Sequence, residues 1–154
     1  MSSSPFEEVI HKLKLDLPPA PKPVGSYHPV VISGKMAFVS GQVSKDSKGN
    51  IFSGKIGKEL TLAQGQEAAR LAALNVVSLI KNHIGFDRFV RVLRVVGYVQ
   101  TASDFYEIPQ VVNGASDLFL QIFQDKGIHA RSAVGVASLP MNAAVEIEAT
   151  LEIM

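Results

Sequence analysis

The chain has 154 residues, of which 47% are hydrophobic and 19% charged, a composition that excludes a disordered protein and suits one domain with a buried core. Its 15 lysines and arginines balance 14 aspartates and glutamates, so the net charge of +1 argues against nucleic acid as a partner. The chain has no cysteine, which excludes disulfides, thiolate metal sites and a cysteine nucleophile.

A short helix and a stiff arm are predicted ahead of the main domain. Residues 5–15 carry apolar side chains at helical spacing behind Ser4, a candidate N-cap. The following stretch, LPPAPKPVG at residues 17–25, holds four prolines that impose an extended connector. We therefore divide the chain into an N-terminal helix and arm, residues 1–20, and a main domain, residues 21–154. The helix either packs on its own chain or contacts a neighbouring subunit.

The main domain is predicted to begin near Tyr27 and to alternate strands with helices. Residue periodicity and turn signals place its elements. In chain order they are strands over 30–32 and 36–43, a helix over 62–84, a strand over 90–101, a helix over 109–126, and strands over 132–138 and 144–153. The last two strands are joined by a turn around Pro140, which predicts a hairpin.

No apolar run approaches membrane-spanning length, because Arg91 and Arg94 interrupt the longest candidate region, residues 89–99. The N-terminus also lacks the charged and apolar regions of a signal peptide. We therefore expect a soluble cytoplasmic protein with no membrane partner.

The element order indicates an α+β fold with two helices on one face of a mixed sheet. The final strand alternates strictly, with five apolar side chains on one face and a largely acidic opposite face. The apolar residues are Val145, Ile147, Ala149, Leu151 and Ile153, and the others are Glu146, Glu148, Thr150 and Glu152. Because no third layer is available to cover the second face of the sheet, we expect self-association into a closed ring.

Arg131 stands at the mouth of an otherwise small and apolar strand, and Glu146 follows 15 residues later. If the turn around Pro140 makes a hairpin, both side chains stand on neighbouring strands. An arginine fork suits bidentate capture of a carboxylate, and a nearby glutamate suits holding a water or moving a proton. Spacing alone equally allows an ordinary cross-strand ion pair.

Other candidates carry weaker signals. The four histidines, His11, His28, His83 and His129, lack metal-ligand spacing; His129 either faces the pocket of Arg131 or is a polar loop residue. Ser40 and Gly41 end a strand where glycine permits close approach to a ligand or another subunit, or a bulge. The Tyr27 hydroxyl either edges a pocket or packs.

Together these pieces resemble the RidA/YjgF family, also labelled endoribonuclease L-PSP. The resemblance runs from about residue 21 to residue 154 and is carried by VGSYHPVVISGKMAFVSGQV, the alanine-rich helix, Asn113, HARSAVGVASLP and AAVEIEATLEI. It implies a chorismate-mutase-like α+β fold and a homotrimer whose sheets form a central barrel, with a pocket at each subunit interface.

The resemblance also implies hydrolytic deamination of reactive enamines and imines of the 2-aminoacrylate or 2-iminobutyrate type, without a cofactor or metal. In that family's pattern Arg131 holds the substrate carboxylate and Glu146 positions water or shuttles a proton. The remaining pocket residues would shape the site and bind the nitrogen end of the substrate. They are Tyr27, Ser40, Gly41 and Asn113.

Four positions depart from the family pattern: Ser26, Ser116, His129 and Ala133. The altered pocket wall leaves two functions open, deamination of another imine or a non-catalytic trimer that binds a small carboxylate or a partner protein. A ribonuclease, the older label, is disfavoured by the near-neutral charge and the lack of a histidine pair.

Overall fold

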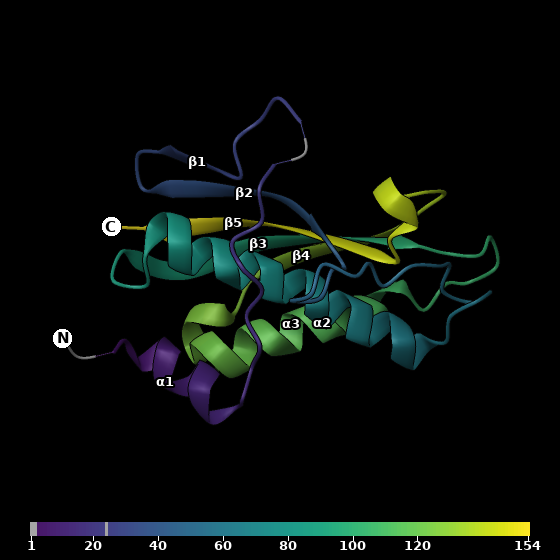
Figure 1. Cartoon of the computed structure of the whole chain (residues 1–154), viewed down its shortest axis with the longest axis horizontal. Helices are drawn as coiled ribbons and strands as arrows, with labels where there is room; N and C mark the ends of the chain where they lie inside the picture. The colour runs from purple at the N-terminus through teal and green to yellow at the C-terminus, as the bar shows by residue number, and fades with distance from the viewer. Residues whose placement is uncertain (1–2, 24) are drawn as a thin grey trace.

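The computed structural model describes residues 3–23 and 25–154 and shows two long helices against one face of a five-stranded sheet (Figure 1). Its main elements are β1 (Val30–Ser33), β2 (Met36–Val43), α2 (Leu62–Leu79), β3 (Phe89–Gln100), α3 (Ile108–Phe123), β4 (Ala130–Val136) and β5 (Val145–Ile153). A π-helical turn, Ile80–Ile84, extends α2, and short 3-10 turns occupy Gln124–Gly127 and Pro140–Asn142. The predicted α+β fold with two helices on one side of a mixed sheet is confirmed.

The strand order is β1-β2-β5-β3-β4, with every pair antiparallel except β3 and β4. The predicted hairpin between the last two strands is therefore wrong, since β3 lies between β4 and β5. The buried side chain of Gln100, at the end of β3, is bonded to the segment that joins β4 to β5. It donates to the carbonyl of Gly54 and to Oδ1 of Asn142, and it accepts from the backbone N–H of Leu139. The bonds to Leu139 and Asn142 hold this connection over the end of β3, where the chain crosses from β4 to β5.

The core lies between the sheet and the pair α2 and α3. The predicted alternation of β5 is confirmed, because its apolar side chains are buried and the intervening ones are partly exposed. Four alanines of α2, Ala68, Ala69, Ala72 and Ala73, are fully buried, which brings the helix close to the sheet. In the described part of the chain, no helix is long and apolar enough to span a membrane.

The opposite face of the sheet has no covering layer among the described residues (Figure 1). Apolar side chains from β1, β2 and β4 remain 40–52% exposed there. They are Val31, Met36, Phe38 and Val134. Glu146 and Glu148 of β5 share this face, because their neighbours in the strand point into the core.

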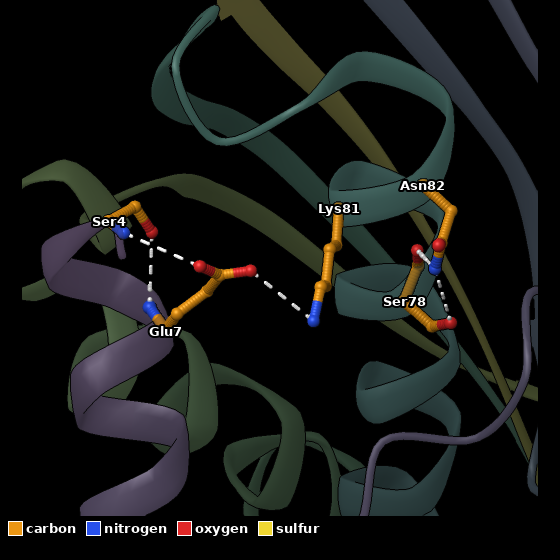
Figure 2. A network of polar contacts seen from close by, with 5 residues as sticks. All are labelled: Ser4, Glu7, Ser78, Lys81 and Asn82. Carbon is orange, nitrogen blue, oxygen red and sulfur yellow. Dashed lines mark hydrogen bonds and ion pairs between the residues drawn. The ribbon is translucent and has the colours of Figure 1, made fainter. Parts of the chain in front are cut away.

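The N-terminal helix α1 (Pro5–Lys12) packs on its own chain. Ser4 caps it as predicted, and Glu7 forms both the capping box and an ion pair of 3.3 Å with Lys81 of the π-turn (Figure 2). The arm then crosses α2, where the fully buried Ser78 hydroxyl donates to the carbonyl of Pro18 at 2.6 Å. Residues 1–2, and Val24 in the predicted arm, lie outside the described residues.

Phe6 anchors α1 through edge contacts with three core phenylalanines, Phe86, Phe89 and Phe123, whose ring centroids lie 5.1–5.7 Å away. We expect Phe6→Ala to lower the free energy of unfolding by about 2 kcal/mol, because a partly buried aromatic contact is lost. Urea denaturation would measure this change. Tyr106→Ala, at an 80% exposed position, serves as the control and is expected to change stability by less than about 0.5 kcal/mol. An equal effect of both substitutions would contradict the anchoring role.

Candidate functional site

Arg131 is held by three hydrogen bonds to α3. Its Nη1 donates to Oδ1 of Asn113 at 2.7 Å and to the hydroxyl of Ser116 at 3.1 Å, and Nη2 donates to the carbonyl of Pro109 at 3.3 Å. A guanidinium carries five N–H donors. Two of them, on Nε and Nη2, have no protein partner among the described residues. The fixed fork therefore presents donors suited to a carboxylate.

His129 completes this group through Ser116. Its Nδ1 lies 2.6 Å from the carbonyl of Gly127, which only accepts, so Nδ1 carries the proton. Burial lowers the pKa of His129 below its ordinary value, and the charge of Arg131 acts in the same direction against the opposing bond to Gly127. The neutral ring then accepts the Ser116 hydroxyl at Nε2, 2.9 Å away, while that hydroxyl accepts from Arg131. We call Arg131, Asn113, Ser116 and His129 the arginine half-site.

Glu146 lies over a bulge in β2. The register between β2 and β5 slips between Val39 and Gln42, so Ser40 and Gly41 stand in the irregular stretch that the sequence left open. A Cβ built on Gly41 would lie 2.9 Å from Cδ of Glu146. Glycine is therefore required there for the carboxylate to occupy its position.

Tyr27 joins Gly41 and Glu146 in the wall of one cavity. Ser40 does not line this cavity but supports its wall. Its hydroxyl donates to the carbonyl of His28 at 2.7 Å, and its N–H donates to the carbonyl of Pro29. Ser40 thus holds the loop that carries Tyr27. We call Tyr27, Gly41 and Glu146 the glutamate half-site.

The two half-sites lie on opposite faces of the sheet within one chain. Arg131 is in register with the buried Val95 of β3 and contacts α3, whereas Glu146 points to the uncovered face. The expectation that Arg131 and Glu146 stand on neighbouring strands is wrong, because β3 separates β4 from β5. A cross-strand ion pair between them within one chain is excluded by the same geometry.

The pKa values of two groups on the uncovered face of the sheet, Glu146 and Tyr98, are raised. Burial raises the pKa of Glu146 above its ordinary value of 4.5, and the nearby charge of Glu148 acts in the same direction. Tyr98 donates to Glu148 at 2.5 Å, and this bond, together with burial, raises the pKa of Tyr98 to about 12. Tyr98 therefore stays a donor, and Glu148 stays directed toward it.

Two polar residues near these groups were not predicted as site residues. Ser116 was noted only as a departure from a family pattern, yet it bridges Arg131 and His129. Asn75, 1% exposed, lies in the wall of the cavity that holds Glu146. The one signal for Asn75 in the sequence is a polar residue within an apolar stretch of helix, which does not distinguish a site from a structural hydrogen bond.

Comparison with known proteins identifies the family. Residues 7–152 match the model described as YjgF/chorismate mutase-like, putative endoribonuclease, and the chain belongs to this family. It is 43% identical over 146 residues to Protein TCP17 of Trypanosoma cruzi, which covers 94% of this chain and 91% of that protein. It is also 29% identical over 139 residues to a 2-iminobutanoate/2-iminopropanoate deaminase of Dermatophagoides farinae, covering 90% of this chain and 94% of that enzyme.

The solved structures agree with this assignment. A protein of unknown function from Agrobacterium tumefaciens superposes with a TM-score of 0.88 at 37% identity, covering 97% of this chain and 94% of that one. The resemblance proposed from the sequence motifs and the chorismate-mutase-like fold that it implied are thereby confirmed.

Proposed function

We propose that this chain hydrolyses reactive enamines and imines that carry a carboxylate, of the 2-aminoacrylate or 2-iminobutyrate type, to 2-keto acids and ammonia. The observation that carries the proposal is the arginine half-site, a guanidinium fixed by three bonds to α3 with two donors left for a carboxylate. Relatives named 2-iminobutanoate/2-iminopropanoate deaminases support the reaction class at 29% identity.

The reaction needs a carboxylate clamp and a group that moves a proton. Arg131 would bind the substrate carboxylate and so orient the imine carbon. Glu146 would take a proton from water as the oxygen bonds to that carbon and the C=N electron pair moves to nitrogen. With the imine protonated at the start, the same carboxyl would then protonate the amino nitrogen of the adduct. As that nitrogen leaves as ammonia, the hydroxyl would return its proton to the carboxylate and the carbonyl would form. An enamine enters this sequence after protonation at its β-carbon.

A complete site would require two copies of the chain, because the two half-sites face away from each other. The uncovered sheet face carries the glutamate half-site beside the exposed Val31, Phe38 and Val134. Burying these side chains against another copy would bring its arginine half-site to Glu146. A homotrimer with a pocket at each interface is the arrangement that we propose.

The test couples an L-amino-acid oxidase, as an imine source for alanine and 2-aminobutyrate, to the purified protein. Decay of the imine is followed by trapping with semicarbazide, with wild type and Glu146→Gln compared. Faster decay that depends on Glu146 supports the deaminase. Binding of a small carboxylate without faster decay of either imine would favour the non-catalytic trimer instead. Glu152→Gln, on the same face of β5, is the matched control.

The raised pKa of Glu146 predicts a shifted acid limb in the pH profile of kcat/KM. Because the base acts when deprotonated, a raised pKa means that activity is lost at a pH above that of an ordinary glutamate as the solution is acidified. Glu148→Gln removes a like charge, lowers the pKa of Glu146 and should move the limb to lower pH. An unchanged limb in Glu148→Gln, or an equal shift in Glu152→Gln, would contradict this assignment.

A further inference from the structure

Ser116 links Arg131 to His129 inside the arginine half-site. Its side chain lies on α3, is 8% exposed, and places Oγ 3.1 Å from Nη1 of Arg131 and 2.9 Å from Nε2 of His129. A hydroxyl has one hydrogen to donate, whereas a guanidinium can only donate. Ser116 therefore accepts from Arg131 and gives its own hydrogen to His129.

The imidazole of His129 is held in the tautomer that can accept this hydrogen. Nδ1 donates to the carbonyl of Gly127 at 2.6 Å, which leaves Nε2 of the neutral ring as an acceptor. Burial lowers the pKa of His129, and the charge of Arg131 adds to this effect against the bond to Gly127, so the ring is neutral at neutral pH. The ring also meets Phe119 of α3 edge-on, with centroids 6.1 Å apart at an interplanar angle of 87°. Both contacts fix the position of Nε2 beside Ser116.

We propose that His129 is a positioning residue for the substrate carboxylate, which keeps the Ser116 hydroxyl turned toward Arg131 and thereby holds the guanidinium in its binding orientation. The inference rests on the proposed function, in which Arg131 binds that carboxylate. A helical serine that lacks another acceptor tends to donate to a carbonyl three or four residues earlier in its own helix. Such a bond would compete with the orientation of Ser116 that Arg131 requires, and His129 prevents it by taking the hydrogen.

The orientation of the guanidinium matters because its donors are divided between the protein and the ligand. Nη1 of Arg131 donates to Asn113 and Ser116, and Nη2 donates once to the carbonyl of Pro109. One N–H on Nε and one on Nη2 then remain for a carboxylate. Without the bond to Ser116, one side of the fork is no longer fixed, and the remaining donors lose part of their alignment with the ligand.

The experiment compares two substitutions of His129 that each keep one of its two bonds. The amide of His129→Asn reaches the place of Nδ1 and can donate to Gly127, but it leaves Ser116 without an acceptor. The longer amide of His129→Gln reaches the place of Nε2 and can accept from Ser116. Calorimetry with 2-oxobutyrate measures Kd, and the oxidase-coupled assay with 2-iminobutyrate measures KM and kcat. We expect His129→Asn to raise Kd and KM by about tenfold with kcat within about twofold of wild type, and His129→Gln to recover most of the lost affinity.

A double-substitution cycle tests whether His129 acts through Ser116. Ser116→Ala alone should raise Kd by about tenfold, and adding His129→Asn to it should raise Kd by less than a further twofold or so. A purely structural role of His129 predicts additive losses instead. The matched control is His83→Asn, which changes an exposed histidine in the π-helical turn and should leave Kd and KM unchanged.

Additive losses in the cycle would overturn the proposal, and so would equal losses in His129→Asn and His129→Gln. An unchanged Kd in Ser116→Ala would overturn it without any change at His129, which keeps the test valid if His129→Asn fails to fold. Binding of 2-oxobutyrate by wild type without hydrolysis of any imine would overturn the proposed function but not the positioning role. Absence of binding by wild type would overturn both.

Discussion

Arg131→Ala is expected to lower kcat/KM for 2-iminobutyrate by about 100- to 1,000-fold, the largest effect on activity of any single substitution in the arginine half-site. Truncating one partner of a buried, hydrogen-bonded charge pair costs about 2–5 kcal/mol, which corresponds to losses of this size. Arg131→Lys should recover little of the lost activity. The guanidinium bonds to Asn113 and Pro109 and still has N–H groups for a carboxylate, and an ammonium cannot make both sets of bonds in this geometry. Imine-trapping kinetics with a single oxidase would measure all three proteins.

The matched control is Arg91→Ala. Arg91 lies on β3, is exposed, and makes one hydrogen bond, to the carbonyl of Ile128. Its removal changes the net charge by the same amount as Arg131→Ala, yet should leave kcat/KM within about twofold, because surface substitutions away from a site have small effects. Equal losses in both variants would show that charge, and not the half-site, controls activity.

Mixing two inactive variants tests whether one site takes residues from two chains. A chain with Arg131→Ala still supplies Glu146, and a chain with Glu146→Gln still supplies Arg131. Random reassembly of equal amounts in a cyclic trimer pairs both intact residues at about a quarter of the interfaces, so about a quarter of the wild-type activity should return. If subunits exchange but no activity returns, Arg131 and Glu146 of one site would have to come from the same chain. That result would contradict a site shared between two chains.

The fold was largely predictable because burial imposes a period on the sequence. The alternation in β5 and the alanine-rich stretch of α2 each identify an element and its buried face. Periodicity contains no information about which strands are neighbours, and here it led to a hairpin that does not form. The deciding contact is long-range, since Gln100 binds a connection about 40 residues further along the chain.

The residue types of the candidate site could be predicted from the sequence, whereas their arrangement could not. Arg131 and Asn113 were expected in one pocket, and the structure joins them at 2.7 Å. The separation of Arg131 from Glu146 follows from strand order, which the spacing of 15 residues does not encode. Asn75 lines a cavity together with residues of the arm and of β2, and the helical pattern around it does not encode this long-range arrangement.

Gly114→Ala is expected to give the largest loss of stability, although glycine is a poor helix former. In an exposed helix the change to alanine would stabilise the protein by about 1 kcal/mol. At Gly114, however, a Cβ would lie 2.8 Å from the backbone carbonyl carbon of Gln66 and 3.0 Å from its Cα. Backbone atoms of α2 cannot rotate away as a side chain would, so the two helices must separate.

We expect Gly114→Ala to lower the free energy of unfolding by about 2–3 kcal/mol, as overpacked cores do, and the melting temperature by roughly 5–10 °C. Asp117→Ala, one turn later on the exposed side of α3, is the control and should be neutral or slightly stabilising. Gly114 lies between Asn113 and Ser116, so separating the helices also moves the groups that hold Arg131, and kcat/KM should fall even below the melting transition. A Gly114→Ala protein as stable as wild type would mean that α2 and α3 do not approach this closely in solution, and the fixed geometry of the arginine half-site would lose its structural basis.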